Sequence, residues 1–349
     1  MIIVGGVPFE SNSTDQGSSD LVALMEHPVL VSTSLSFKAI PEKKFSISDT
    51  YSDEVEKKRH VYVFQREYAT VDPTLVDLIG TDEATTCVGV VIRNRDNGMT
   101  SVAHMDYPAI VDHGLSQMLE KLVDCKHESE MDVHLIGGFE ECPNKHDEHT
   151  QLRSKAPNDH SFPLCAKIIE AFVRSTVKFH IHTLFVLRHN TKIGTVGNAL
   201  PIFSGFLVQT RTGSIVSATF DQTTRCPDEL VRRIRVSASF SDSQWRNKLL
   251  ETYDTQTDQF IIAPCYWSIR LVHMASYLQQ LPDEEILHTC STSPYAEAPD
   301  FIDNQKRMWN YLIQYPNWKE SFKLGKPRIF ARTVSGGWMM VEQAHEAAS

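Results

Sequence analysis

TTCVGVVIRNRDNGMTSVAHM, residues 85–105, is the stretch of sequence that decides the fold. Two runs rich in β-branched residues flank the pair Asn97-Gly98, which tolerates the positive φ angles of a tight hairpin turn. The stretch therefore predicts two antiparallel strands, one over residues 85–93 and one over residues 99–105. Cys87 and His104 are then expected on neighbouring strands of one sheet.

Strands and helices follow one another irregularly around this hairpin. The patterns predict further strands at 61–64, 132–139, 178–187, 203–209, 215–220 and 328–333, and helices at 21–25, 112–125, 165–177, 227–234 and 301–315. Because regular βαβ repeats are missing, this order favours a layered α+β architecture. Residues 59–349 contain no linker rich in Pro, Gly or Ser and are expected to form a single domain. Residues 1–58 are expected to form a partly polar, mobile N-terminal extension.

Composition excludes several classes of protein. The chain has 349 residues, 34 of them basic and 44 acidic, which gives a net charge of −10. Without clustered Lys and Arg, no binding to nucleic acid is expected, and no run approaches the ~20 apolar residues of a membrane helix. Met1 to Val7 is too short and uncharged for a secretory signal. The seven cysteines are odd in number and scattered, which indicates reduced thiols and a cytoplasmic or nuclear location.

Cys87 and His104 are the residues best suited to chemistry. A thiolate is a strong nucleophile, and it needs a base within hydrogen-bond reach. His104, 17 positions after the thiol and across the hairpin, is placed to supply that base. Taken alone, however, the two residues also fit a buried structural pair, which is the commoner arrangement. The segment Cys142–His149 lacks the second Cys pair of a typical zinc site, and Cys290 has no suitably spaced His.

Four stretches carry a resemblance to a known family: YVFQRE at 62–67, LIGTDEATTC at 78–87, VHLIGGF at 133–139 and STSPYAE at 291–297. In this order they resemble the protein N-terminal asparagine amidohydrolases, although Ile79 separates a Leu and a Gly that are adjacent in that family. The resemblance implies a catalytic domain that deamidates an N-terminal asparagine of a protein or peptide to aspartate. It implies Cys87 as a nucleophile that forms a thioester, His104 as acid and base, and a product that enters the N-degron pathway. Neither a metal nor a cofactor is expected.

A more distant resemblance involves the same residues. The chemoreceptor glutamine deamidases and some deamidating toxins carry a Cys–His pair on a β-sandwich. In the chemoreceptor enzymes a Thr lies six residues before the Cys and the His lies 17 after it, as Thr81, Cys87 and His104 do here. This likeness implies a layered β-sandwich with flanking helices, in which Thr81 orients the imidazole. Thr85-Thr86 replaces the Gly-Ser of those enzymes next to the thiol.

Recognition of a free α-ammonium group requires a carboxylate near the nucleophile. Asp82, Glu83 and Glu297 lie inside the matched motifs and are the candidates, while Thr85 and Thr86 are expected to contact the substrate beside the thiol. Two alternatives use the same residues. In the first alternative the chain would be a deamidase of internal Gln or Asn side chains. In the second it would be a non-catalytic reader of N-terminal residues.

Overall fold

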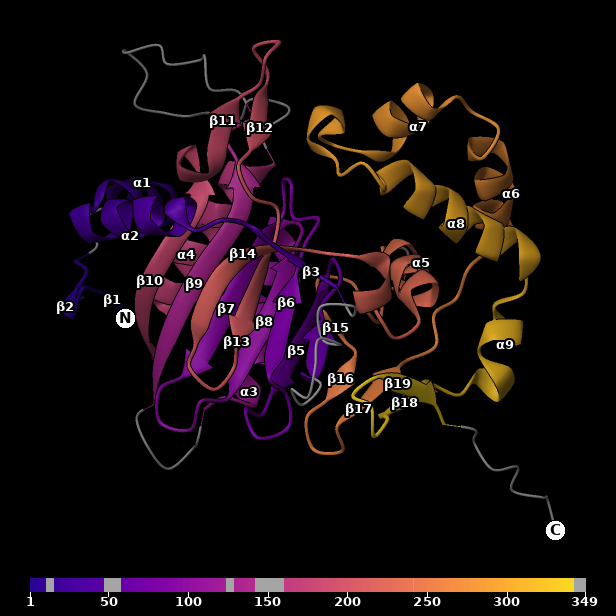
Figure 1. Cartoon of the computed structure of the whole chain (residues 1–349), viewed down its shortest axis with the longest axis horizontal. Coiled ribbons are helices and arrows are strands. Elements are labelled where there is room, and N and C mark those ends of the chain that lie inside the picture. The colour runs from indigo at the N-terminus through magenta and orange to yellow at the C-terminus, as the bar shows by residue number, and fades with distance from the viewer. Residues whose placement is uncertain (11–15, 47–57, 124–128, 142–159, 241, 342–349) are drawn as a thin grey trace.

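Two β-sheets dominate the computed structural model, which describes residues 1–10, 16–46, 58–123, 129–141, 160–240 and 242–341 (Figure 1). The larger sheet has eight strands in the order β15 (Leu250–Glu251), β5 (Glu67–Val71), β8 (Thr100–Met105), β7 (Val88–Asn94), β9 (Glu130–Phe139), β10 (Lys178–Leu187), β1 (Ile2–Val4) and β2 (Val7–Pro8). The smaller has five, in the order β3 (Lys43–Phe45), β14 (Ser214–Phe220), β13 (Phe206–Gln209), β6 (Leu78–Thr81) and β4 (His60–Tyr62).

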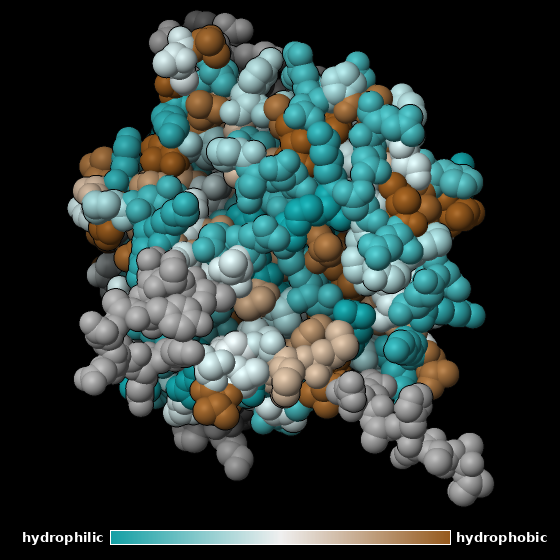
Figure 2. All heavy atoms as spheres, turned by 45° about the vertical axis from the view of Figure 1, so that its right-hand side comes forward, coloured by the Kyte–Doolittle hydropathy of each residue, from teal (hydrophilic) through white to brown (hydrophobic). Residues whose placement is uncertain are grey.

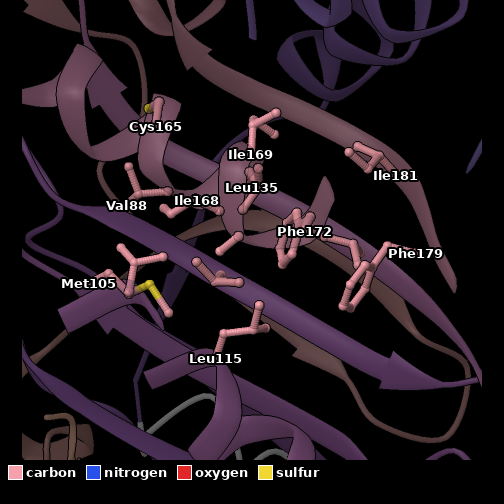
Figure 3. Packing of buried hydrophobic residues seen from close by; sticks show 14 of the residues in the cluster. Val88, Met105, Leu115, Leu135, Cys165, Ile168, Ile169, Phe172, Phe179 and Ile181 are labelled. Atoms are coloured by element: carbon pink, nitrogen blue, oxygen red, sulfur yellow. The ribbon is translucent and has the colours of Figure 1, made fainter. Parts of the chain in front are cut away.

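The alternation of side chains along β7 explains the layers. Val88 and Ile92 face the core that α3 (Val111–Glu120) and α4 (Ser161–Arg174) cover, and Figure 3 shows Val88 in this core. Gly89 and Val91 face the five-stranded sheet instead, since a Cβ atom at Gly89 would lie only 2.2 Å from the ring of Phe206 on β13. The eight-stranded sheet is therefore packed between helices and the second sheet, and the predicted α+β fold is confirmed.

The predicted hairpin is confirmed as well. Strands β7 and β8 are antiparallel, and Gly89 lies opposite His104. Gly98 has a φ of 75° in the turn, as the Asn-Gly pair predicts. Cys87, expected inside the strand, instead directly precedes it, because β7 begins at Val88. The predicted strands at 132–139 and 178–187 correspond to β9 and β10 within two residues at each end.

The N-terminal extension expected over residues 1–58 packs into the fold where the structure describes it, within residues 1–46. Strand β1 pairs in parallel with β10, and β3 pairs with β14, so this segment contributes to both sheets. Helices α1 (Gln16–Glu26) and α2 (Pro28–Ala39) add Leu21 and Leu30 to the core that α3 and α4 also cover. The helix predicted at 21–25 lies inside α1, whereas no strand was predicted at the positions of β1 and β3.

The C-terminal part adds helices beside the sheets. Helix α5 (Glu229–Ser239) contacts α8 (Phe301–Gln314), which in turn contacts α6 (Ile269–Leu278) and α7 (Asp283–Cys290); α9 (Trp318–Ser321) follows. A small sheet of β16 (Tyr253–Asp254), β17 (Gln259–Ile262), β18 (Arg328–Arg332) and β19 (Trp338–Met340) lies below them in Figure 1, and the ribbon of β11 (Thr191–Ile193) and β12 (Ala199–Pro201) stands at the top. Figure 2 shows a mainly hydrophilic surface on the face that carries these helices. None of the helices in the described ranges has the length and apolar character of a membrane span.

Candidate active site

The loop between β6 and β7 crosses from one sheet to the other and carries the predicted site. Thr81 ends β6 in the five-stranded sheet, and Cys87 comes just before β7 in the eight-stranded sheet. His104 lies on β8, opposite Gly89 of β7. Gly89 follows Cys87 by two positions. The register of β7 and β8 therefore brings the chain positions of Cys87 and His104 close together at this end of the hairpin.

His104 has one nitrogen fixed and the other unoccupied. Its Nδ1 lies 2.8 Å from Oγ1 of Thr81, and its buried Nε2 has no hydrogen-bond partner among the described residues. Only 1% of the residue is exposed, and burial lowers the pKa of His104 to about 4. Oγ1 of Thr81 also lies 3.5 Å from the carbonyl of Asp82, as a donor. This arrangement favours an imidazole that donates from Nδ1 to Thr81 and keeps a lone pair on Nε2.

Cys87 is uncharged in this environment. The residue is 9% exposed, and burial raises the pKa of its thiol well above the ordinary value, with further increases from Asp106 and Glu297. Arg66 opposes this effect. The pKa shifts of the two groups favour a neutral thiol and a neutral imidazole over a preformed thiolate–imidazolium pair.

Asp82 points away from the thiol. Successive residues of a strand alternate between faces, so Asp82 lies on the side opposite Thr81. Its carboxylate accepts hydrogen bonds from the Tyr62 hydroxyl at 2.5 Å, from the Phe220 backbone at 2.8 Å and from Arg225 at 3.0 Å. These three partners fix the Asp82 carboxylate within the protein.

Glu83 is held by two arginines. Both Nη atoms of Arg233 lie 2.9 Å from its carboxylate oxygens, and Arg225 lies at 2.8 Å. Burial alone would raise the pKa of Glu83, but the two guanidinium groups outweigh it and hold the pKa below its ordinary value. Glu83 also has a φ of 62°, which a non-glycine residue adopts only when its surroundings enforce it. This cluster therefore fixes the loop that carries Cys87.

Thr85 and Thr86 join the thiol loop to the C-terminal motif. Oγ of Ser293 donates to Oγ1 of Thr85 at 3.0 Å, and the hydroxyls of Thr86 and Thr292 lie 3.2 Å apart. Within the described residues, the backbone N–H groups of Thr86 and Cys87 donate no hydrogen bond to the chain. They are available to an oxyanion formed next to the thiol.

Of the three predicted carboxylates, Glu297 is the one for which the described residues provide no arginine partner. Its carboxylate accepts a hydrogen bond from the Ser291 hydroxyl. Burial raises the pKa of Glu297 to about 7, Ser291 lowers it, and the charge of Glu83 adds to the rise. Since Glu297 also raises the pKa of Cys87, its charge acts at the thiol. Glu297 is thus the candidate that most lacks a counter-charge.

Two further features were not predicted as parts of the site. The buried Arg66 pairs with Asp106 at 2.9 Å, and its backbone N–H donates to the carbonyl of His104. Asp106 lies where the β7–β8 register, continued by one residue, would be opposite Cys87. The quoted YVFQRE stretch contains Arg66, but only the three-dimensional pairing shows its place. The second feature is the pair of arginines around Glu83.

Within the described ranges, His, Cys, Asp and Glu side chains form no group of three or more that is arranged to hold a metal ion. The segment Cys142–His149 lies outside the described residues. His180 and His182 instead hydrogen-bond to Glu130 and Asp132 at 2.8 and 2.7 Å.

Comparison with known proteins agrees with the motifs. Residues 50–340 match the model of the family described as protein N-terminal asparagine amidohydrolase. A protein of that name from Arabidopsis thaliana is 54% identical over 345 residues, 97% of this chain and 99% of its own length. The Sus scrofa protein of the same name is 30% identical over 292 residues, 82% of this chain and 85% of its own length.

Fold and comparisons together define the class: the protein is an amidohydrolase, a hydrolase of amide C–N bonds. The chain belongs to the protein N-terminal asparagine amidohydrolase family.

Proposed function

We propose that the protein converts an N-terminal asparagine of a protein or peptide into aspartate and releases ammonia, with Cys87 as the nucleophile and His104 as acid and base. The observation that carries this proposal is the buried Nε2 of His104, which has no hydrogen-bond partner among the described residues while Nδ1 is held by Thr81, on the strand paired with the one that Cys87 precedes. The names of the relatives support the substrate.

The reaction takes place in two halves. Nε2 of His104 accepts the thiol proton while the sulfur of Cys87 bonds to the side-chain carboxamide carbon. The N–H groups of Thr86 and Cys87 stabilise the oxyanion. The C–N bond then breaks as His104 returns the proton to the nitrogen, which leaves as ammonia. Water attacks the thioester and gives a proton to His104, the C–S bond breaks, and the proton returns to the sulfur.

Glu297 is proposed to bind the α-ammonium group. Because its pKa is about 7, the carboxylate is half protonated near neutral pH and ionises fully when a cation binds. The α-amine itself loses its charge above about pH 8. We therefore expect KM to rise both below pH 7 and above pH 8, and Glu297→Gln to remove the acidic limb while leaving kcat largely intact.

We propose that the reaction takes place in the cytoplasm or nucleus and that its product, a chain with N-terminal Asp, enters the N-degron pathway. The five cysteines in the described ranges are free thiols, which suits a reducing compartment.

The test measures ammonia release from a short Asn-first peptide, its Gln-first twin and its N-acetylated form. Release from the free Asn-first peptide alone supports the proposal. Equal release from the acetylated peptide would favour a deamidase of internal side chains. Saturable binding without ammonia would favour a reader of N-terminal residues.

A further inference from the structure

Four buried or largely buried arginines share one mode of pairing. Each directs the edge formed by Nε and Nη2 at a single carboxylate of the chain, the geometry in which guanidinium binds an oxyanion with two parallel hydrogen bonds. The pairs are Arg66 with Asp106, Arg232 with Glu67, Arg328 with Asp228 and Arg332 with Asp258.

Arg235 on α5 is an exception to this pattern. The residue is 0% exposed, and its Nη1 donates to the backbone carbonyl of Glu251 at 3.1 Å. Nε and Nη2, which form the pairing edge in the other four, are buried and have no hydrogen-bond partner in the described part of the chain. A buried guanidinium with an empty pairing edge is costly, because the charge has lost water without gaining an anion.

The neighbouring carboxylates are already in use. Glu67 accepts two hydrogen bonds from Arg232 and one from the backbone of Phe64. The side chain of Glu251 pairs with Lys121. Neither is therefore available as the missing partner of Arg235.

Trp245 adds a third unused donor. The guanidinium carbon of Arg235 lies 4.8 Å from the centroid of its ring, and the buried indole Nε1 has no hydrogen-bond partner in the same ranges. We propose that Arg235 and Trp245 form a binding site for a small oxyanion, either a carboxylate or an inorganic phosphate or sulfate, between α5 and residues 242–248. The anion takes the position that a carboxylate of the chain holds at the other four arginines.

This site is separate from the thiol. The hydrogen bond and ring contact of Arg235 join α5 to Glu251 and Trp245, and no residue of the proposed catalytic set is among them. Residues 242–248, which include Trp245 over the guanidinium, are themselves half-buried or exposed, so the side of the site formed by this segment faces solvent. Failure of the anion site would leave the proposed deamidation untouched, and the reverse also holds.

The test follows thermal unfolding of the full chain while formate, phosphate or sulfate replaces chloride at constant ionic strength. The variants are Arg235→Met and Trp245→Phe, and the matched control is Arg246→Met at an exposed position on the same segment. We expect a saturable rise in Tm for the wild type and the control, a smaller rise for Trp245→Phe, and only the unsaturable effect of excluded salts for Arg235→Met. Comparison of the formate arm with the phosphate and sulfate arms identifies the preferred chemistry.

The unfolding temperature of Arg235→Met in chloride shows whether the buried guanidinium lacks a counter-charge or stabilises the protein through its packing. In chloride alone, Arg235→Met should unfold at the same temperature as the wild type or higher, because it removes an unpaired buried charge. An anion response in Arg235→Met equal to that of the wild type would overturn the proposal. If that variant does not fold, crystals of the wild type soaked in selenate decide: an anomalous peak at Nε and Nη2 of Arg235 supports the site, and water alone refutes it.

Discussion

The molecule contains two cysteine–histidine pairs that look alike in composition. Cys87 and His104 lie at the proposed catalytic site. The second pair is Cys226 and His60, the first residue of β4, with Sγ 3.9 Å from Nε2. Burial lowers the pKa of each histidine to about 4 and raises the pKa of each thiol. By residue type and burial alone, either pair qualifies as a nucleophile and base.

The hydrogen bonds of the two imidazoles distinguish the pairs. Nε2 of His60 lies 3.0 Å from the backbone carbonyl of Thr224, which can only accept, so this nitrogen carries the proton. The nitrogen closest to the Cys226 thiol is thus unable to act as a base. In His104 the fixed nitrogen is Nδ1, and Nε2 has no partner within the part of the chain that the structure describes. We therefore propose only the Cys87–His104 pair as catalytic, because the corresponding nitrogen of His60 is bound to a carbonyl.

The largest expected effect separates the two thiols. Cys87→Ala should lower ammonia release from an Asn-first peptide by at least about 10³-fold, because the covalent step is lost. Cys226→Ala should leave the rate nearly unchanged. Steady-state kinetics on both variants check this, with unfolding curves to confirm that each is folded. Full activity in Cys87→Ala would refute the assignment and turn attention to the half-buried Cys290.

The two imidazoles should differ nearly as much. His104→Gln is expected to lower kcat by roughly 10²- to 10⁴-fold, the usual contribution of general acid–base catalysis. His60→Gln should instead retain kcat and most of the stability, because the glutamine amide can donate to the carbonyl of Thr224 in place of Nε2. The measurements are kcat and urea unfolding for both variants. A large loss of kcat in His60→Gln, with the protein still folded, would contradict the comparison.

The sequence predicts the local part of this site well. The β7–β8 hairpin depends on β-branched runs and the Asn97-Gly98 turn, all within 21 residues, so periodicity suffices to place Cys87 near His104. Thr81 is different: it lies in the other sheet, and only the spacing known from a resembling family pointed to it. Strand alternation, once β6 is known, also explains why Asp82 and Thr81 have opposite surroundings.

Contacts between residues far apart in the chain could not be predicted from the sequence. Thr86 meets Thr292 across 206 positions, and Thr85 meets Ser293 across 208. The motif at 291–297 was visible, but nothing in its composition indicates which loop it contacts. Likewise Arg233 occurs in an amphipathic helix pattern, and its pairing with Glu83 depends on how α5 packs.

A smaller effect tests the orientation of His104. Thr81→Val keeps the shape but removes the oxygen 2.8 Å from Nδ1. We expect kcat to fall about 10- to 100-fold, the range for partners that orient a histidine, with KM little changed. Thr81→Ser restores a hydroxyl and should recover most of the activity. If Thr81→Val and Thr81→Ser behave alike, the hydroxyl has no orienting role and the difference between the two histidines rests on Nε2 alone.

The two histidines should differ least in how they affect stability at acidic pH, because burial lowers the pKa of both. Each has an ordinary pKa of 6.5 and a folded pKa of about 4, so the unfolded chain binds more protons between these values. The free energy of unfolding is then constant above about pH 6.5 and falls as pH drops towards 4, by up to ~1.4 kcal/mol per pH unit for each histidine. His60→Gln and His104→Gln should each flatten this slope by about one proton, which urea unfolding at pH 4.5–7 measures. An unchanged slope in both variants would mean that these imidazoles become protonated while the protein stays folded. Burial would then not keep His104 in the neutral form that the proposed base requires.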